Sequence, residues 1–465
     1  MNKKRLRSVY MAFDVLAALI TWVIFMYFRK MVNDASFFDG VYVFVPNYNF
    51  YSSLLVFPFC CLFIHYLSGI YLNPQNHKLL KIFSTTFVAS LIISIAIFFA
   101  LLLDDIVVSY HFYYYSLLVL FGILFVITFI FRAVICLVVK SKYKSGHWAV
   151  RTAIIGTGDN ARKVAEDLKK ELKRNILIGY ISENKHANSS DTVLGTVAQL
   201  EAVIRKNHID EIIIALDDND EKKLFSLINA LYSYHVNVRF TPGIYEILIG
   251  GVKTNELRTT PMINISEFPM RDWEACVKRF FDILLSAVSL LLLLPLFLFL
   301  AVCIKINSRG TVFFRQERIG RYGRPFNILK FRTMYVDAEK GVPQLSNPND
   351  SRITSVGRVL RKYRLDELPQ FWNVLKGEMS LVGPRPEREY YIKQITERAP
   401  YYCLIYKIRP GLTSWGPIRV GYTDTLDKMV ERLNYDIIYM ENMSLTTDVK
   451  ILLYTIEVIF KGKGM

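Results

Sequence analysis

The chain has 465 residues, of which 52% are hydrophobic and 14% aromatic, and its formal net charge is +16. This composition excludes a disordered or fibrous chain and argues against a purely soluble enzyme. Positive charge combined with so much apolar surface indicates contact with anionic lipid or other phosphates rather than with nucleic acid. The charge is uneven, at +7 over residues 1–145, −2 over 146–277 and +11 over 278–465.

Residues 1–145 contain four long apolar runs, at 8–28, within 40–77, at 82–103 and at 112–131. About 20 apolar residues cross a bilayer core, so we predict four transmembrane helices. Basic side chains flank the runs at both ends of the module and between the second and third runs, which places both ends in the cytoplasm. Asp14 interrupts the first run, and an acid in a membrane is either functional or part of helix packing.

Residues 146–270 are predicted to form a small Rossmann-like, CoA-binding-like α/β domain. A strand at 149–155 leads into a G-x-G-x-x-A turn that begins at Gly156, and a helical pattern follows to Lys173. Further strands are expected at 176–181, 209–216 and 236–240. The turn is typical of dinucleotide sites, but the acidic ribose partner expected about 20 residues later is matched only by Glu183. A ligand-free tight turn and a regulatory nucleotide site both stay open, with the tight turn favoured.

The run from Ile283 to Ile304 carries no charge and is long enough for a fifth span. A spanning helix would move the basic residues that follow it to the outside, against the positive-inside rule. Pro295 lies at the midpoint, where proline kinks a helix. We therefore expect residues 278–306 to form a re-entrant hairpin, with Lys278 and Arg279 anchored on lipid headgroups, and a straight span is the alternative.

The segment after this run combines carboxylates with arginines. We expect two short strands around Gly320–Gly323 and then one amphipathic helix over 358–376, which carries the adjacent acids Asp366 and Glu367. One carboxylate of such a pair can act as a nucleophile while the other holds a hard divalent cation with substrate phosphates. Two prolines fix the backbone around Arg385, which suits a guanidinium that binds phosphate. An isolated Asp-Glu pair can also simply balance the basic face of its own helix.

Residues 278–465 resemble the catalytic domain of the bacterial sugar transferases, the polyprenyl-phosphate hexose-1-phosphate transferases (monotopic phosphoglycosyl transferases). The whole chain resembles the large form of that family. The architecture implied is a four-span α-helical membrane bundle (1–145), a Rossmann-like α/β domain (146–270) and a mainly α monotopic catalytic domain with a re-entrant membrane helix (271–465). The residues that carry the resemblance are Lys278-Arg279-x-x-Asp282, Lys330-Phe-Arg-Thr-Met334, Leu365-Asp366-Glu367-Leu368, Asn373-Val-Leu-Lys-Gly377, Met379-Ser-Leu-Val-Gly-Pro-Arg385-Pro386, Arg409-Pro-Gly-Leu-Thr413, Trp415 and Asp436-x-x-Tyr439.

The resemblance implies a reaction as well as a fold. Asp366 matches the nucleophile that attacks the β-phosphate of a UDP-sugar and releases UMP, after which polyprenyl phosphate takes the sugar phosphate. Glu367 matches the residue that holds magnesium, or manganese in its place. The implied location is the cytoplasmic face of a bacterial inner membrane, the implied pathway is the start of exopolysaccharide, capsule, O-antigen or glycoprotein glycan assembly, and a homodimer is what the large relatives suggest. The other matched positions are Arg361, Arg385, Lys330 and Arg409 for phosphate, Lys278, Arg279, Asp282 and Pro295 for the membrane hairpin, and Trp415, Asp436 and Tyr439 near the uridine or sugar.

Residues 414–421 depart from the usual pattern of the family, and this leaves recognition of the sugar or uridine there in doubt. Two other classes of protein share part of the architecture. A membrane-bound nucleotide-sugar dehydratase would need a second Rossmann domain and a Tyr-x-x-x-Lys pair, and the sequence has neither. A non-catalytic polysaccharide-export scaffold would not need the motifs of residues 278–465. The sequence does not identify the sugar.

Overall fold

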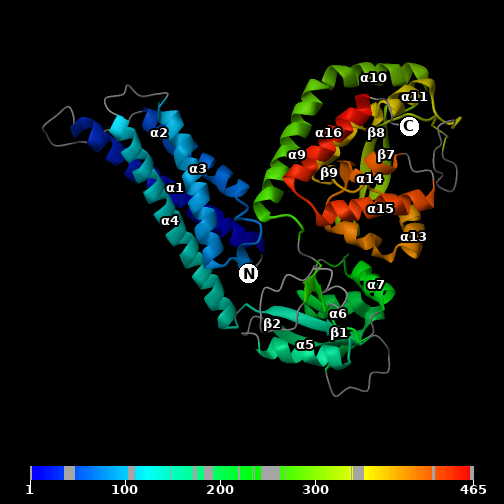
Figure 1. Cartoon of the computed structure of the whole chain (residues 1–465), viewed down its shortest axis with the longest axis horizontal. Helices are drawn as coiled ribbons and strands as arrows, with labels where there is room; N and C mark the ends of the chain where they lie inside the picture. Colours follow the sequence, from blue (N-terminus) through cyan, green and yellow to red (C-terminus); the bar gives the residue numbers. More distant parts are fainter. Residues whose placement is uncertain are drawn as a thin grey trace. The chain divides into compact units, whose positions relative to one another are not determined.

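The computed structural model divides the chain into two compact units (Figure 1). One unit comprises residues 1–149 with 271–277, and the other comprises residues 150–270 with 278–465. The predicted boundaries at 145/146 and 270/271 stay predictions, and Glu183 lies outside the described residues. The residues that the structure describes are 3–35, 48–102, 110–146, 148–170, 175–182, 192–217, 220–232, 234, 236–241, 262–265, 268–336, 338, 350–421 and 425–460.

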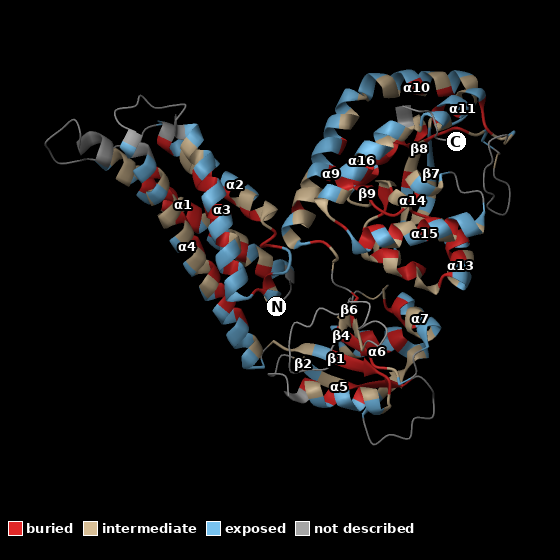
Figure 2. Ribbon diagram, in the orientation of Figure 1, coloured by how far each residue is buried: buried red, intermediate tan, exposed pale blue. Residues whose placement is uncertain are grey.

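The first unit contains four helices that are long and apolar enough to cross a membrane, as the apolar runs predict. Many of their large apolar residues are exposed, while the buried residues of the bundle include small, aliphatic and aromatic ones. Figure 2 shows the buried residues gathered between the helices. Outward-facing apolar side chains are what a helix in lipid requires. The helices are α1 (Lys3–Ala35), α2 (Tyr48–Leu67), α3 (Leu79–Leu102) and α4 (Tyr110–Lys144), with a short 3₁₀ helix η1 (Pro74–Asn76) between α2 and α3.

A buried ion pair joins the helices of this bundle. The Arg132 guanidinium of α4 donates from Nε to Asp14 Oδ1 at 2.9 Å and from Nη2 to Asp14 Oδ2 at 2.8 Å. Its Nη1 donates to the Thr86 hydroxyl of α3 at 2.9 Å, and the Tyr71 hydroxyl donates to Asp14 Oδ2 at 2.5 Å. Both charged side chains are fully buried. Asp14 therefore makes the contacts that the expected helix-packing role requires.

The first residues of α9 (Asp272–Leu292) belong to the same unit as the bundle. Lys81 Nζ lies 2.5 Å from Asp272 Oδ2. Gly69 has a φ of +79°, and a Cβ at this position would lie 2.6 Å from the Asp272 backbone carbon. A glycine is required here because the turn after α2 touches the backbone of α9 and is left-handed.

The second unit begins with an α/β domain whose six strands have the order β3-β2-β1-β4-β5-β6. Strands β1 to β5 pair in parallel and β6 is antiparallel to β5. All four residues of β4 are buried, as expected of a central parallel strand. The four predicted strands are present, and β3 and β6, which are four and two residues long, were not predicted. The elements are β1 (Val150–Ile155), α5 (Asp159–Lys170), β2 (Asn175–Ser182), β3 (Val193–Thr196), η2 (Val197–Gln199), α6 (Leu200–Asn207), β4 (Glu211–Ile214), α7 (Glu221–Tyr232), β5 (Asn237–Phe240) and β6 (Ile263–Asn264).

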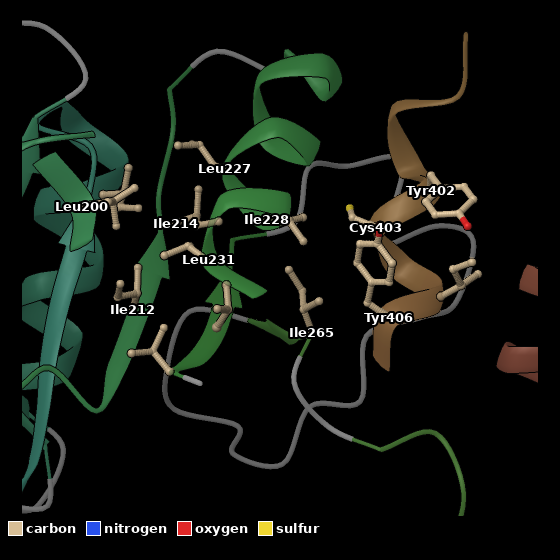
Figure 3. Packing of buried hydrophobic residues seen from close by; sticks show 14 of the residues in the cluster. Leu200, Ile212, Ile214, Leu227, Ile228, Leu231, Ile265, Tyr402, Cys403 and Tyr406 are labelled. Carbon is tan, nitrogen blue, oxygen red and sulfur yellow. The ribbon is translucent and has the colours of Figure 1, made fainter. Parts of the chain in front are cut away.

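The α/β domain shares a hydrophobic core with the residues that follow it. Leu227, Ile228 and Leu231 of α7 lie in one buried cluster with Tyr402 and Cys403 of the 3₁₀ helix η5 (Pro400–Lys407) (Figure 3). The Cys403 thiol also points to a backbone carbonyl of α7, at 3.8 Å from Phe225 O. Helix α7 thus packs against the sheet on one side and against η5 on the other.

The region after residue 278 contains the bent pair α9 and α10. Only the two helices together are long and apolar enough to cross a membrane, and the chain bends by 60° between them. The break falls at Leu293, and Pro295 lies in the first turn of α10 (Leu294–Asn307), where its missing N–H costs no hydrogen bond. Antiparallel strands β7 (Phe313–Ile319) and β8 (Pro325–Phe331) follow, joined by the turn η3 (Arg321–Gly323).

The predicted continuous helix over 358–376 is wrong. Helix α11 (Ser355–Lys362) ends before Arg364, whose φ of +54° is left-handed and cannot continue a right-handed helix. The acids lie in a separate 3₁₀ helix, η4 (Leu365–Gln370), and α12 (Phe371–Lys376) follows Pro369. The remaining elements are β9 (Ser380–Val382), α13 (Glu389–Arg398), η5 (Pro400–Lys407), β10 (Gly411–Thr413), α14 (Trp415–Val420), α15 (Leu426–Glu441) and α16 (Leu445–Phe460).

Candidate active site

Asp366 and Glu367 lie side by side in η4, and each is only 8% exposed. The left-handed turn at Arg364 carries the chain from α11 into η4. Strand β8 packs against η4 and brings Lys330 to the carboxylates, while Arg385 reaches them from the turn after β9. The structure therefore gathers four of the predicted site residues, which the sequence separates by up to 55 positions.

Glu367 is surrounded by cations. Its Oε1 lies 3.0 Å from Lys330 Nζ and 2.9 Å from Arg385 Nη2. Its Oε2 lies 3.5 Å from Arg364 Nη1. Burial alone would raise the pKa of this carboxyl group, but the three cations hold it well below the ordinary value. Glu367 is a permanent anion at neutral pH.

Asp366 differs from its neighbour. Among the described residues, none donates a hydrogen bond to its carboxylate, although Lys330, Arg361 and Arg385 are close enough to favour its charged form. Burial outweighs these cations, and the adjacent negative charge of Glu367 adds to it, so the pKa of Asp366 is raised to about 6. This carboxylate is ionised at neutral pH, is poorly solvated and has free lone pairs, which are the properties of an activated nucleophile.

The pKa values of the two cations nearest the acids are themselves shifted. Glu367 raises the pKa of the Arg385 guanidinium, while burial lowers the pKa of the Lys330 ammonium. Arg361, the next predicted phosphate ligand, donates from Nε to the Thr333 hydroxyl at 2.9 Å. The four cations Lys330, Arg361, Arg364 and Arg385 face two carboxylates, so the site has an excess of positive charge that a substrate diphosphate would balance.

The turn that carries Arg385 is held from behind by α15. Asp436 Oδ2 accepts from the Arg385 backbone N–H at 3.3 Å, and its Oδ1 accepts from the Ser414 hydroxyl. One turn earlier, Arg432 pairs with the buried Glu387, which Arg318 also contacts at 3.5 Å. Burial raises the pKa of Asp436 to about 6. These contacts place Asp436 in support of the turn that carries Arg385.

Three predicted positions have their described contacts with residues other than the two acids. Arg409 donates from Nε to Gly377 O at 2.9 Å and is not among the side chains that contact Asp366 or Glu367. Trp415 lies 6.4 Å from the Tyr435 ring, measured between ring centroids. The Tyr439 hydroxyl donates to Asp448 Oδ1 at 2.6 Å, inside the fold. Their roles in uridine, sugar or phosphate binding stay predictions.

The residues at the start of the hairpin contact the protein itself. Lys278 Nζ lies 2.5 Å from Asp448 Oδ2, and Arg279 Nη1 donates to Val374 O at 2.9 Å. Asp282 accepts from the Ser380 hydroxyl at 2.7 Å and from the Leu381 backbone N–H at 3.1 Å. These three side chains fasten α9 to α12, β9 and α16, and contact of Lys278 and Arg279 with lipid headgroups stays a prediction.

Sequence reasoning missed the supporting residues Arg318, Glu387 and Arg432. Arg318 belongs to the basic run after the hairpin, and Glu387 directly follows the Pro-Arg-Pro turn, so both were visible as charges. Their pairing was not visible in the sequence, because it joins β7, the turn after β9 and α15. Arg364 was visible as one of the basic residues before the acids, but its left-handed backbone was not.

No cluster of three or more His, Cys, Asp or Glu side chains suited to a metal occurs within the described ranges. A divalent ion at this site would therefore depend on Asp366 or Glu367 together with substrate phosphates, which is how magnesium is ordinarily bound at phosphate-transfer sites. The paired, buried carboxylates fit that mode in number and in chemistry. Both Glu367 oxygens now face cations, so an ion there would share or replace those partners.

Comparison with known proteins identifies the families that two parts of the chain match. The family model for bacterial sugar transferases matches residues 273–462, and the model for a CoA-binding domain matches residues 65–242. A UDP-glucose:undecaprenyl-phosphate glucose-1-phosphate transferase from Klebsiella pneumoniae is 34% identical over 316 residues, which cover 67% of each chain. A UDP-N-acetylgalactosamine-undecaprenyl-phosphate N-acetylgalactosaminephosphotransferase from Aeromonas hydrophila is 40% identical over 50% of this chain and 54% of its own length.

A third relative, a UDP-glucose:undecaprenyl-phosphate glucose-1-phosphate transferase from Escherichia coli, is 34% identical over 62% of this chain and 61% of its own length. The chain thus spans between about half and two-thirds of the length of these relatives. These matches support neither the dehydratase nor the export scaffold. The chain belongs to the bacterial sugar transferase family, and with it to the class of undecaprenyl-phosphate sugar phosphotransferases.

Proposed function

We propose that the chain transfers a sugar 1-phosphate from a UDP-sugar to undecaprenyl phosphate through a covalent intermediate on Asp366. The observation that carries this proposal is the contrast within one turn of η4. Glu367 contacts three cations, whereas Asp366 is buried near two of them, Lys330 and Arg385, and near Arg361, with no donor among the described residues. A carboxylate in that state can attack a phosphorus atom once a diphosphate enters the site.

In the first half-reaction an Asp366 carboxylate oxygen bonds to the β-phosphorus, the bond from that phosphorus to the bridging oxygen breaks, and UMP leaves with the electron pair. In the second half-reaction an oxygen of undecaprenyl phosphate attacks the same phosphorus and frees Asp366. Arg385, Lys330 and Arg361 bind the phosphate oxygens and offset the charge that builds up on them. Glu367 is the proposed magnesium ligand, and a bound ion would add further charge neutralisation.

We also propose that α9 and α10 enter and leave the cytoplasmic leaflet as a re-entrant hairpin. The 60° bend, the proline at the start of α10 and the basic residues on both sides of the pair support this proposal. Single cysteines placed just before residue 278 and just after residue 309 should both react with a reagent confined to the cytoplasmic side. Labelling from opposite sides would show that the pair spans the membrane.

The proposed activity is tested with purified full-length chain in nanodiscs that contain undecaprenyl phosphate. Each UDP-sugar of a panel is added with Mg²⁺, and released UMP and lipid-linked product are quantified. We expect at least one UDP-sugar to give UMP and undecaprenyl-diphospho-sugar in equal amounts, and none to give UDP. Release of UDP, or product without UMP, would contradict transfer of a sugar phosphate.

The sugar and the pathway are narrower questions. The relatives named above act on glucose or N-acetylgalactosamine donors. Both kinds of donor carry the diphosphate that Lys330, Arg361 and Arg385 would bind. The same panel ranks the donors by kcat/KM. We propose initiation of a cell-surface or secreted glycan on the cytoplasmic face of the inner membrane as the setting, with a homodimer as the working assembly.

A further inference from the structure

The glycine-rich turn of the α/β domain lies where parallel α/β sheets commonly bind ligands. Strand β1 lies between β2 and β4, so the chain connections diverge on either side of it. The crevice at the carboxyl ends of such strands is the usual ligand site in this architecture, with a phosphate at the N-terminus of the following helix. Here that helix is α5.

A side chain of the protein already occupies this position. Asp217, which follows β4, accepts a hydrogen bond at Oδ1 from the Asn160 backbone N–H in the first turn of α5, at 3.0 Å. The Asn160 side chain in turn donates to Leu216 O at 3.0 Å and so ties the same two segments together. The Asp217 carboxylate makes the contact with α5 that a bound phosphate would make.

The glycines of the turn are explained by the same contacts. A Cβ on Gly158 would lie 1.3 Å from Asp217 Oδ2, so the missing side chain leaves room for that carboxylate. Gly156 has a φ of +121°, and a Cβ there would lie 2.2 Å from Ala215 O. In a dinucleotide site such glycines make room for the pyrophosphate. In this chain they make room for the residues that follow β4.

We propose that Asp217 is a built-in substitute for the phosphate at the N-terminus of α5, so that the α/β domain binds no dinucleotide or CoA through this turn. Asp159 adds a second negative charge to the same helical turn, and like charges at this position oppose a phosphate. The proposal goes beyond the transferase reaction. It also separates this domain from the CoA binding that gives the matching family model its name.

The geometry is tested in the full-length chain in nanodiscs by hydrogen–deuterium exchange of the peptide that covers the first turn of α5. Gly158→Ala should displace the Asp217 carboxylate and speed exchange at that turn, as Asp217→Ala does. The double variant should exchange no faster than Asp217→Ala alone. Unchanged exchange in Gly158→Ala, or additive effects in the double variant, would overturn the proposed contact.

Gly156→Ala is the matched control. Its added methyl would meet the backbone of Ala215 rather than Asp217. Its effect on exchange should therefore persist, and add, in the Asp217→Ala background. Loss of its effect in that background would show that removal of Asp217 relaxes the whole turn, and the specific claim about Gly158 would fail.

Ligand binding is tested with NADH by fluorescence and with CoA by calorimetry on the same preparation. We expect no saturable binding tighter than about 1 mM. Saturable binding accompanied by protection of the first turn of α5 from exchange would overturn the proposal. Binding that leaves this turn unprotected and is displaced by UMP would locate the ligand at the transferase site and leave the proposal standing.

Discussion

Among the described residues, charge is buried in several places, and two of these regions differ in how the charges are matched. In the membrane bundle, one arginine meets one aspartate through two hydrogen bonds, and further bonds from Tyr71 and to Thr86 complete the set. In the catalytic region, four cations surround two acids, and Asp366 has no donor among the described residues. A matched buried pair holds helices together, whereas an unmatched cluster keeps binding capacity for a charged substrate.

Loss of Asp366, the acid without a described hydrogen-bond donor, should give the largest effect on activity. We expect Asp366→Asn to lower kcat by about 10⁴-fold or more, as removal of a covalent nucleophile does. The variant should unfold at the same or a higher temperature than wild type at pH 7.5, because it no longer buries an ionised carboxylate. UMP release and thermal unfolding in nanodiscs measure both. A variant that is inactive because it fails to insert or fold would not support the assignment.

The matched pair should behave in the opposite way. Arg132→Leu leaves the Asp14 carboxylate buried without its partner and should cost about 3–5 kcal/mol of stability. The double variant Asp14→Leu/Arg132→Leu should recover most of that loss, since two apolar residues replace two charges. Its kcat per folded molecule should equal that of wild type. A catalytic defect in the stable double variant would give the bundle a chemical role that this comparison denies.

Arg385 reaches Glu367 from the turn after β9, and phosphate binding is its proposed role. Arg385→Lys keeps the charge but loses the planar fork that reaches Glu367, and we expect kcat/KM to fall by about 10- to 100-fold. Arg398→Lys is the matched control, because Arg398 forms an exposed pair with Asp427. An equal loss in both variants would indicate a general effect of lysine on folding rather than on phosphate binding.

The pKa of Asp366 predicts a pH dependence. The attacking form is the carboxylate, so kcat/KM should fall about tenfold per pH unit below about pH 6. The pKa of Asp366 is higher in the folded state than in the unfolded chain, so the ionised carboxylate destabilises the fold. This destabilisation grows as pH rises from about 4 to about 6. The difference in unfolding temperature between Asp366→Asn and wild type should widen over that window. A difference that is independent of pH would contradict the raised pKa.

The smallest effect is expected at the start of α9. The Lys81–Asp272 pair is partly exposed, at 43% and 25% of the two side chains, so Lys81→Gln should cost at most about 1 kcal/mol. Gly69→Val, which would meet the backbone of α9, should cost more. Thermal unfolding of the two variants ranks them. A larger loss for Lys81→Gln would show that the ion pair, rather than the close backbone approach, holds this junction.

Local patterns predicted the elements well and their endings poorly. Long apolar runs marked the four bundle helices, and runs rich in β-branched residues marked the strands from β1 to β5 apart from β3. The helix expected over 358–376 failed at Arg364, because a left-handed residue other than glycine leaves no trace in hydrophobic periodicity. The short edge strands β3 and β6 were not predicted, because two to four residues are too few to show an alternating pattern.

The candidate site likewise contains residues that the sequence pointed to and residues that it did not. Motifs singled out Asp366, Glu367, Arg385 and Lys330, and the fold brings these four side chains together. Their roles stay predictions. Their partners Arg318, Glu387 and Arg432 were not found, because they meet across elements far apart in the chain. Asp14 was found as an anomaly in an apolar run, but its partner Arg132 lies just beyond the run predicted for the fourth span. A charge is visible in a sequence, whereas its pairing depends on the fold.

Asp366 and its freedom to form a bond are the centre of this account, and pre-steady-state release of UMP tests them most directly. Full-length chain in nanodiscs without undecaprenyl phosphate is mixed with its UDP-sugar and Mg²⁺, quenched and analysed for UMP and for intact protein mass. We predict a burst that approaches one UMP per active site and a mass increase of one sugar phosphate, both absent in Asp366→Asn. UMP release that requires undecaprenyl phosphate from the first turnover, with no change in protein mass, would contradict a covalent intermediate on Asp366.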